Sequence, residues 1–374
     1  MNKKIILKLG ILTLALILNA SLSASLWAAA PTKKSEFTKS INKEFDISKK
    51  GKVAIKGKYG DISITTWNKN KVKFDIRIIV KAPSKEKADE LFKRIAIDFR
   101  DQGNLVEAVF NMKDGGRSWG WRSYKSVSYK IHFDVKIPST NDVNLYNKYG
   151  NIHLTDISGN ASLENKYGDI KIGDAKNVDL ILGYGKADLG HIKDLDVQIK
   201  YSKLDVESAK NAKIASKYSR IYIDKAMDIR SESKYDKYYL GDINDLRNYG
   251  KYDDFEIKSL KSIDATAKYT DYDIGDFSGT ANFDMQYGDA DIKQVKNGFE
   301  SVSFKGKHAD LIFDLKGKGA NIEINTKHTK VKLPSDLKTE HYIEERAEIN
   351  VEGKIRGGGN RIKATAAYGS VIIY

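Results

Sequence analysis

The residues of this sequence that are best placed to bind a ligand are cations that recur around a repeated tyrosine. One cation precedes the tyrosine directly and another follows it two residues later, so stacked repeats would bring like charges about 5 Å apart. Such a stripe is costly unless it is solvated or paired with anions. The spacing therefore predicts a groove for a repeating anionic polymer; a solvated face whose lysines deter edge aggregation is the alternative. The cations concerned are Lys200, Lys203, Lys217, Arg220, Lys234 and Lys237.

A second group of candidate binding residues lies in the Gly-flanked stretch GRSWGWRSYKS, residues 116–126. Trp119, Trp121 and Tyr124 lie there among the basic residues Arg117, Arg122 and Lys125. Aromatic rings beside guanidinium groups suit stacking on sugars or contacts with anionic headgroups. The alternative is that both tryptophans pack in the core of the N-terminal region.

Neither catalysis nor a metal centre is indicated by the sequence. It contains no nucleophile elbow, no Gly-rich phosphate loop and no zinc-protease motif. His308 and His328 take the place of the repeated tyrosine, which favours a packing role, although stacked side chains could share a metal. The column Asp271, Asp289 and Asp310 could hold a cation weakly. We therefore expect a protein that is not an enzyme and that has no cofactor and no metal.

The elements that position these residues follow from an internal repeat. The repeated tyrosine returns in steps of 18, then 17 six times, then 18, and a fixed period of this length is typical of a solenoid. Val197 and Ile199 alternate with polar residues as in a strand with one buried face, and a two-residue corner follows. We therefore predict an all-β fold, a parallel β-solenoid with rungs of about 17 residues and two short strands in each rung. The tyrosines are Tyr149, Tyr167, Tyr184, Tyr201, Tyr218, Tyr235, Tyr252, Tyr269 and Tyr287.

The corner of each rung has its own expected features. Stacked tyrosines would form an aromatic ladder that serves packing. Gly150, Gly168, Gly185 and Gly288 follow the tyrosine, where the corner is expected to need a positive φ. Polar residues also occupy inward positions of two neighbouring rungs, which predicts either a local weakness or a narrow cavity. These inward residues are Ser231, Ser233, Asn248 and Gly250.

The chain divides into three parts on sequence alone. Residues 1–30 have the basic start, the apolar run and the small final residues of a signal peptide. Residues 31–140 read as an N-terminal β-rich cap with one helix near 84–98, and 52–67 already contain one copy of the repeat. Residues 141–374 form the solenoid repeat domain. A cap would suppress end-to-end association through the open sheet edge.

The net charge and the signal peptide limit the kinds of partner that we expect. The formal charge of +14 falls to +11 when Lys3, Lys4 and Lys8 are removed with the signal peptide. We expect an exported protein, in the periplasm, at the outer-membrane surface or secreted, with no transmembrane span after signal cleavage. Its expected partners are an anionic polysaccharide, lipopolysaccharide or an envelope protein, and no nucleic acid.

The corner motifs Y-G-D-I or Y-G-N-I at 59–62, 149–152 and 167–170 also support a family resemblance. With the exported strand–helix segment before them, they make the chain resemble the bacterial "putative adhesin" domain-of-unknown-function family and, more distantly, the autotransporter-adhesin head domains of Bacteroidetes. The chain has Lys-Tyr where that family has asparagine before the corner Gly. The resemblance implies an envelope or surface location and no enzyme activity.

The residues and the resemblance together lead to one functional expectation. We expect an exported, non-catalytic, adhesin-like protein of the cell envelope that presents a repetitive basic surface to anionic polymers or glycans. Two other classes remain open: a polysaccharide lyase or hydrolase on the same scaffold, and a periplasmic regulatory or sensor partner.

Overall fold

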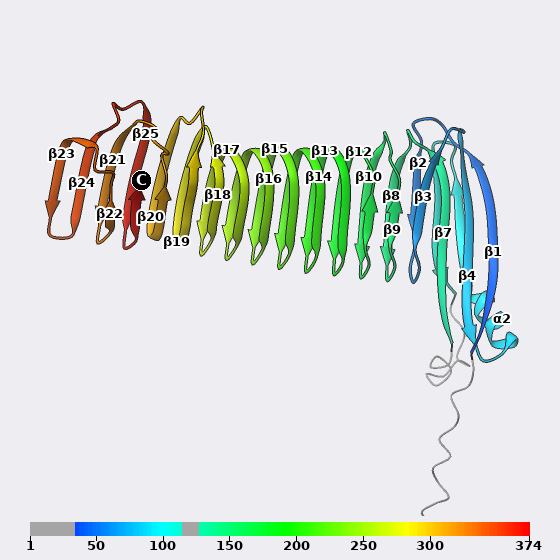
Figure 1. The fold of residues 1–374 in the computed structure, drawn as a ribbon. Helices are drawn as coiled ribbons and strands as arrows, with labels where there is room; N and C mark the ends of the chain where they lie inside the picture. Colours follow the sequence, from blue (N-terminus) through cyan, green and yellow to red (C-terminus); the bar gives the residue numbers. More distant parts are fainter. Residues whose placement is uncertain (1–33, 114–126) are drawn as a thin grey trace, which may run out of the picture.

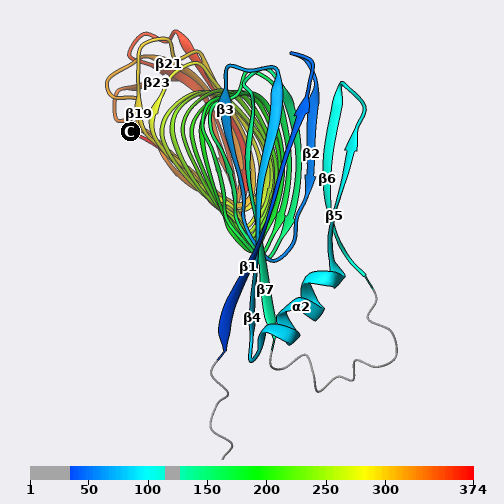
Figure 2. The same cartoon turned by 90° about the vertical axis from the view of Figure 1, so that its right-hand side faces the viewer.

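A computed structural model describes residues 34–113 and 127–374 of the chain. Stacked β rungs form a long rod (Figure 1), and an end-on view has a drop-shaped outline with one narrow and one rounded edge (Figure 2). The fold is the predicted all-β parallel solenoid with a spacing of about 17 residues and about 10 turns.

The strands of the solenoid body pair in parallel and in register. In the regular rungs from β10 to β17 each residue lies beside the residue 17 positions later, as Leu204 beside Ile221. The rungs bury Val, Ile and Leu at every second position, so the apolar alternation of the sequence becomes one continuous core. The body contains β8 (Asp142–Lys148), β9 (Ile152–Leu154), β10 (Asn160–Lys166), β11 (Ile170–Ile172), β12 (Ala175–Gly183), β13 (Lys186–Lys200), β14 (Lys203–Lys217), β15 (Arg220–Lys234), β16 (Lys237–Lys251), β17 (Asp254–Lys268), β18 (Asp271–Phe277), β19 (Thr280–Val295) and β20 (Ser301–Phe313).

The middle rungs differ in one respect from the prediction of two short strands. From β13 to β17 each rung is a single curved strand of 15 residues. Parallel pairing continues through the softer bend and skips only single positions, such as Gly190 and Lys193 in the pairing of β13 with β14. Only the corner at the tyrosine interrupts the strand. We call the half rung after this corner face A and the half rung before it face B.

The N-terminal elements cover the first rung. β2 and β3 form this rung and pair in parallel with β8 and β9. At the N-terminal end of the rod, the strands β7, β4 and β1 continue the sheet of face A beyond β3. The strands β6 and β5 continue the sheet of face B beyond β2. The elements are β1 (Ser35–Asp46), β2 (Lys52–Lys56), β3 (Ile62–Trp67), β4 (Lys71–Ala82), α2 (Lys85–Arg94), β5 (Ile95–Asp101), β6 (Leu105–Met112) and β7 (Ser128–Pro138).

Helix α2 is shorter than the expected 84–98. The Ser84 side chain accepts a hydrogen bond from the amide of Lys87 and caps its start. Its end lies at Arg94, because the backbone of Ile95 is already extended and begins β5. The apolar residues Ala88 and Leu91 are buried as the helical spacing predicted.

The C-terminal strands insert between rungs that are consecutive in sequence. β25 pairs in parallel with both β20 and β21, and β26 pairs with β20 and β22. At the C-terminal end of the rod, β24 and β23 continue the sheet of face B beyond β21 in antiparallel orientation. The elements are β21 (Ala320–Lys327), β22 (Lys330–Lys332), β23 (Leu337–Glu345), β24 (Glu348–Ile355), β25 (Asn360–Ala367) and β26 (Ser370–Ile373).

Candidate functional site

The narrow edge of the rod carries one continuous stack of aromatic rings, which we call the tyrosine edge. Neighbouring ring centres lie 4.6–5.2 Å apart, and the ring planes differ by 1–15°. The predicted ladder is thus present, and it begins one rung earlier than Tyr149. In spatial order it contains Tyr59, Tyr149, Tyr167, Tyr184, Tyr201, Tyr218, Tyr235, Tyr252, Tyr269, Tyr287, His308, Tyr368 and His328.

The corner conformation reverses the expectation for the glycines. The ladder residues themselves adopt the left-handed conformation, from φ 51° at Tyr201 to φ 62° at Tyr149. Of the four corner glycines that were expected to have positive φ, only Gly288 has it, at 122°. Gly168 is needed for space, because a Cβ there would lie 2.1 Å from the carbonyl oxygen of Gly150 in the preceding rung.

The left-handed corner also turns each tyrosine ring out of the core. Tyr201 would point inward if it continued the alternation of Val197 and Ile199, yet its side chain is 50% exposed. Because the rings stack face to face, neighbouring rings cover the ring faces, and the outer edges with their hydroxyl groups meet solvent. The tyrosine edge therefore displays phenol hydroxyl groups at rung spacing and does not display ring faces for sugar stacking.

A column of lysines lies beside the tyrosine edge on face B. Each of its members directly precedes a ladder tyrosine or His308, and none has a carboxylate oxygen within 4.0 Å among the residues that the structure describes. Several contact their own ring instead, as Lys234 does at 5.1 Å from the centre of Tyr235. The lysine column contains Lys58, Lys148, Lys166, Lys200, Lys217, Lys234, Lys251, Lys268 and Lys307.

The six predicted stripe cations are divided between the two sides of the tyrosine edge. Lys200, Lys217 and Lys234 belong to the lysine column on face B. The other three stack on face A, where carboxylates are near: Lys203 lies 2.9 Å from Asp205, and Lys237 lies 2.7 Å from Asp254. Arg220 has no carboxylate partner within 4.0 Å in the described ranges 34–113 and 127–374.

A groove of about 680 Å³ lies along the lysine column on face B. Lys234, Lys251 and Lys268 line it together with two acids, Glu232 and Asp284, and with Tyr249, whose side chain is 68% exposed. Tyr249 was absent from the sequence-based site, although its outward phase in the rung, two residues before Lys251, was a usable signal.

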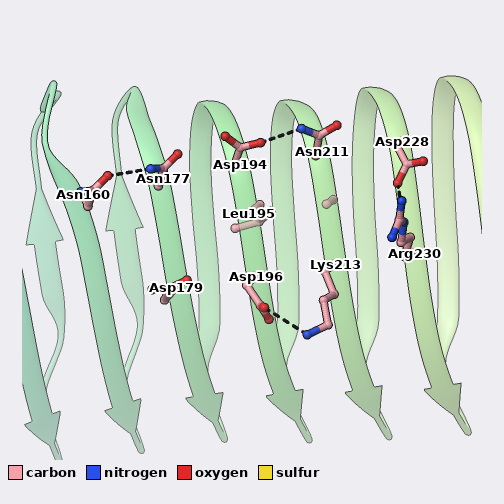
Figure 3. Close-up of a pocket in the computed structure, with 11 residues that line it drawn as sticks. Asn160, Asn177, Asp179, Asp194, Leu195, Asp196, Asn211, Lys213, Asp228 and Arg230 are labelled. Carbon is pink, nitrogen blue, oxygen red and sulfur yellow. Dashed lines mark hydrogen bonds and ion pairs between the residues drawn. The ribbon is translucent and has the colours of Figure 1, made fainter.

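A second groove, of about 810 Å³, crosses face B nearer the rounded edge (Figure 3). Its polar side chains bond to one another: Asn211 donates to Asp194 at 2.6 Å, and Lys213 lies 3.3 Å from Asp196. Arg230 bonds to Asp228 within its own rung at 3.1 Å. Since these groups largely satisfy each other, this groove has less unpaired charge to offer a ligand than the lysine column.

The polar inward residues expected to mark a weakness or a cavity are part of a filled network. Tyr238 is fully buried, and its hydroxyl lies 2.7 Å from that of Ser216. Ser216 donates to the carboxylate of Asp236 and Ser233 donates to that of Asp253, both at 2.8 Å. Burial raises the pKa of both carboxyl groups, that of Asp253 to about 6. Both acids are at most 2% exposed, so they are unavailable to a substrate.

The remaining candidates are placed as follows. Tyr368 stacks between His308 and His328, so the two imidazoles are not neighbours and cannot share a metal ion. No group of three or more metal-binding side chains is present within 34–113 and 127–374. Trp119, Trp121 and Arg122 lie outside the described residues. No helix in the described part of the chain has the length and apolar character needed to span a membrane.

Comparison with known proteins gives structural neighbours only. No family model and no curated protein matches the chain. The solved structures to which it is similar include a "putative cell adhesion protein" from Clostridium sporogenes, at 12% identity and TM-score 0.19, which covers 90% of this chain and 99% of that chain. A "putative adhesin" from Parabacteroides merdae matches at 13% identity and TM-score 0.27, over 73% of this chain and 95% of that chain.

A "putative lipid binding protein" from Parabacteroides distasonis matches at 11% identity and TM-score 0.24, over 73% of this chain and 96% of that chain. The chain is thus similar to structures described as putative adhesins, the group that its sequence resembles.

Proposed function

We propose that this chain is an exported, non-catalytic interaction protein of the cell envelope that binds an anionic polysaccharide along its tyrosine edge. The observation that carries the proposal is the lysine column. Its ammonium groups have no carboxylate partners among the described residues, and they lie alongside a row of exposed phenol hydroxyls. Unpaired cations in a row attract an anionic polymer, because each contact replaces repulsion between lysines with attraction.

The mechanism is polyvalent display. Most rungs supply one lysine and one hydroxyl, and Gly183 and Gln286 take the place of the lysine before Tyr184 and Tyr287. A single rung makes only a weak contact with an anionic group, since its polar groups are solvated before binding. A polymer with regularly spaced acidic groups meets many rungs at once, so weak contacts accumulate through effective concentration. The left-handed corner supports this mechanism, because it directs every hydroxyl outward at the same rung spacing.

The groove at Tyr249 is the strongest single segment of this surface. Three lysines of consecutive rungs, Lys234, Lys251 and Lys268, line it. Tyr249 takes no part in the aromatic stack of the tyrosine edge, so its ring faces stay available to a sugar ring. A sugar unit that carries a carboxylate or sulfate group fits both features.

The direct test is a double charge reversal in this groove. Lys251→Glu with Lys268→Glu should weaken binding to polygalacturonate by about tenfold or more, and the remaining binding should depend less on salt concentration. Isothermal titration at two ionic strengths measures both effects. Neutral dextran, which lacks acidic groups, should not bind either protein.

The matched control carries the same charge change elsewhere. Lys176 and Lys210 are exposed, and they have no carboxylate partner in the described residues. They lie at the rounded edge, away from the tyrosines. Lys176→Glu with Lys210→Glu should leave polygalacturonate binding nearly unchanged. Equal losses in the two double variants would mean that only net charge matters, and cleavage of the polymer would contradict a non-catalytic role.

A further inference from the structure

A column of charges on face A changes sign halfway along the rod. Its residues lie two positions after the ladder tyrosine and stack rung upon rung, with Lys237 beside Asp254 at the change. Over eight successive rungs, four cations precede this point and four acids follow it, while Asp169 lies before this series and Ser370 after it. In order they are Lys186, Lys203, Arg220, Lys237, Asp254, Asp271, Asp289 and Asp310.

Such a series is complementary to itself when it is reversed. A second copy of the chain, turned by a two-fold axis that passes between Lys237 and Asp254, presents its acids to the cations of the first copy. Every cation of this eight-residue series then faces an acid, and each pair occurs twice in the dimer. The pairs are Lys237 with Asp254, Arg220 with Asp271, Lys203 with Asp289, and Lys186 with Asp310 of the second copy.

Three of the four acids are not neutralised within their own chain, whereas Asp254 lies 2.7 Å from Lys237. Asp271, Asp289 and Asp310 have no basic side chain within 4.0 Å in the described residues, and neither does Arg220 find an acid there. Burial and the neighbouring charges of Asp310 and Asp271 raise the pKa of Asp289. The stacked acids thus repel one another, and a row of cations from outside would relieve that repulsion.

Other groups on face A fit the same arrangement. Tyr222 and Tyr239 stack at 4.6 Å on the two rungs that precede the axis, and the reversed copy places Asp273 opposite Tyr222 and Glu256 opposite Tyr239. Aromatic residues near the centre of an interface are favourable anchors. One like-charged pair arises, Asp205 with Asp291, but Asp205 already lies within 3.0 Å of both Lys186 and Lys203 in its own chain.

Other relative orientations of two rods are unfavourable. Parallel rods would place cations on cations and acids on acids along the whole column. Antiparallel rods that met through the tyrosine edges would oppose the lysine column of one copy to that of the other. Of these three arrangements, face A against face A in opposite directions is the one that pairs the charges and leaves both lysine columns in solvent.

We propose that face A is the interface of an antiparallel homodimer held by this sign-changing column. Both tyrosine edges of such a dimer point to the same side, because the two-fold axis runs from the narrow edge to the rounded edge. The dimer therefore presents two side-by-side ridges of hydroxyls and lysines to one surface.

Charge reversal at the Arg220–Asp271 pair tests the proposal. In a dimer of the Arg220→Asp variant, both of these pairs consist of two acids. In a dimer of the Asp271→Arg variant, both pairs consist of two cations. Each variant should dissociate at a concentration at least about tenfold higher than the wild type does. When the two variants are mixed in equal amounts, the introduced acid faces the introduced cation and the two native side chains face each other, so heterodimers should form. Sedimentation velocity with one variant fluorescently labelled detects this rescue.

The controls separate the interface from unfolding. Both variants should retain the far-UV circular dichroism and the melting temperature of the wild-type monomer, and Lys210→Asp at the rounded edge should leave dimerisation unchanged. The double variant Arg220→Asp with Asp271→Arg should dimerise like the wild type. A wild-type protein that stays monomeric at low ionic strength, or a mixture that shows no heterodimer, would overturn the proposal.

Discussion

The carboxylate of Asp253 accepts a hydrogen bond of 2.8 Å from the backbone amide of Asp236, so two acids are stacked one rung apart inside the solenoid. Each also accepts a hydrogen bond from a serine hydroxyl. Burial raises the pKa of Asp253 to about 6, and the charge of Asp236 adds to this rise. The ionised form of Asp253 is therefore less stable in the folded chain than in the unfolded chain.

Stability should consequently fall as the pH rises through the pKa of Asp253. Below the ordinary aspartate pKa of 3.8 the contribution is fully present, and above pH 6 it is lost. The difference corresponds to at most about 3 kcal/mol. Asp253→Asn should unfold at a higher urea concentration than the wild type at pH 7.5. Its free energy of unfolding should also change less with pH between pH 4 and 7 than that of the wild type. A less stable Asn variant at pH 7.5 would show that the carboxylate is needed in its charged form.

The left-handed corner predicts an unusual order of stability for variants at Tyr218, where φ is 53°. Tyr218→Ala removes the stacking and keeps a Cβ in an unfavourable backbone conformation. Tyr218→Gly removes the same stacking but relieves the backbone strain, so it should be more stable than the Ala variant by about 1 kcal/mol. Urea unfolding midpoints measure the difference. An Ala variant that is more stable than the Gly variant would show that the backbone at Tyr218 is not strained.

Close approach between rungs predicts a large cost for Gly168→Ala. The new Cβ would lie 2.1 Å from a backbone carbonyl oxygen, which cannot move without shifting the neighbouring rung. We expect a loss of about 2–3 kcal/mol in the free energy of unfolding. Gly183→Ala is the matched control, because the nearest atom to its Cβ would be a side-chain carbon of Lys166 at 4.0 Å. The two variants should therefore differ clearly in thermal melting.

The outward hydroxyls of the tyrosine edge predict a separation of binding from stability. Replacing Tyr201, Tyr218 and Tyr235 together by Phe keeps the stacked rings and removes three hydroxyl donors. We expect an unchanged melting temperature within about 2 °C, with polygalacturonate binding weakened about three- to tenfold. Binding as tight as in the wild type would leave the lysines as the sole contact groups.

The repeat made much of this protein predictable from its sequence. Strands with one buried face, stacked tyrosines and outward lysines all follow from alternation with period two at a fixed rung length, because parallel in-register stacking places equivalent residues above one another. The cations Lys200, Lys217 and Lys234 could be placed in one column for the same reason.

Other features depend on backbone conformation and were not in the pattern. The sequence could not tell whether the tyrosine or the glycine takes the positive φ, because both dihedral arrangements make a two-residue corner. It did not indicate that Asp236 and Asp253 fill the space beside Ser233 and Gly250, since the direction of a corner side chain depends on the backbone conformation of the corner. The insertion of β25 and β26 between β20 and β22 joins segments far apart in the chain, and no local pattern encodes such a pairing.

The sequence by itself therefore determined the rung, its period and the order of charges along each column, because these depend only on neighbours in the chain and on identical stacking. Tertiary structure alone decided that the corner turns each tyrosine ring outward between the two columns. The left-handed tyrosine sends its ring outward and separates the lysine column on face B from the sign-changing column on face A. That separation leaves one row of cations unpaired for an anionic ligand and makes the other row complementary to its own reverse.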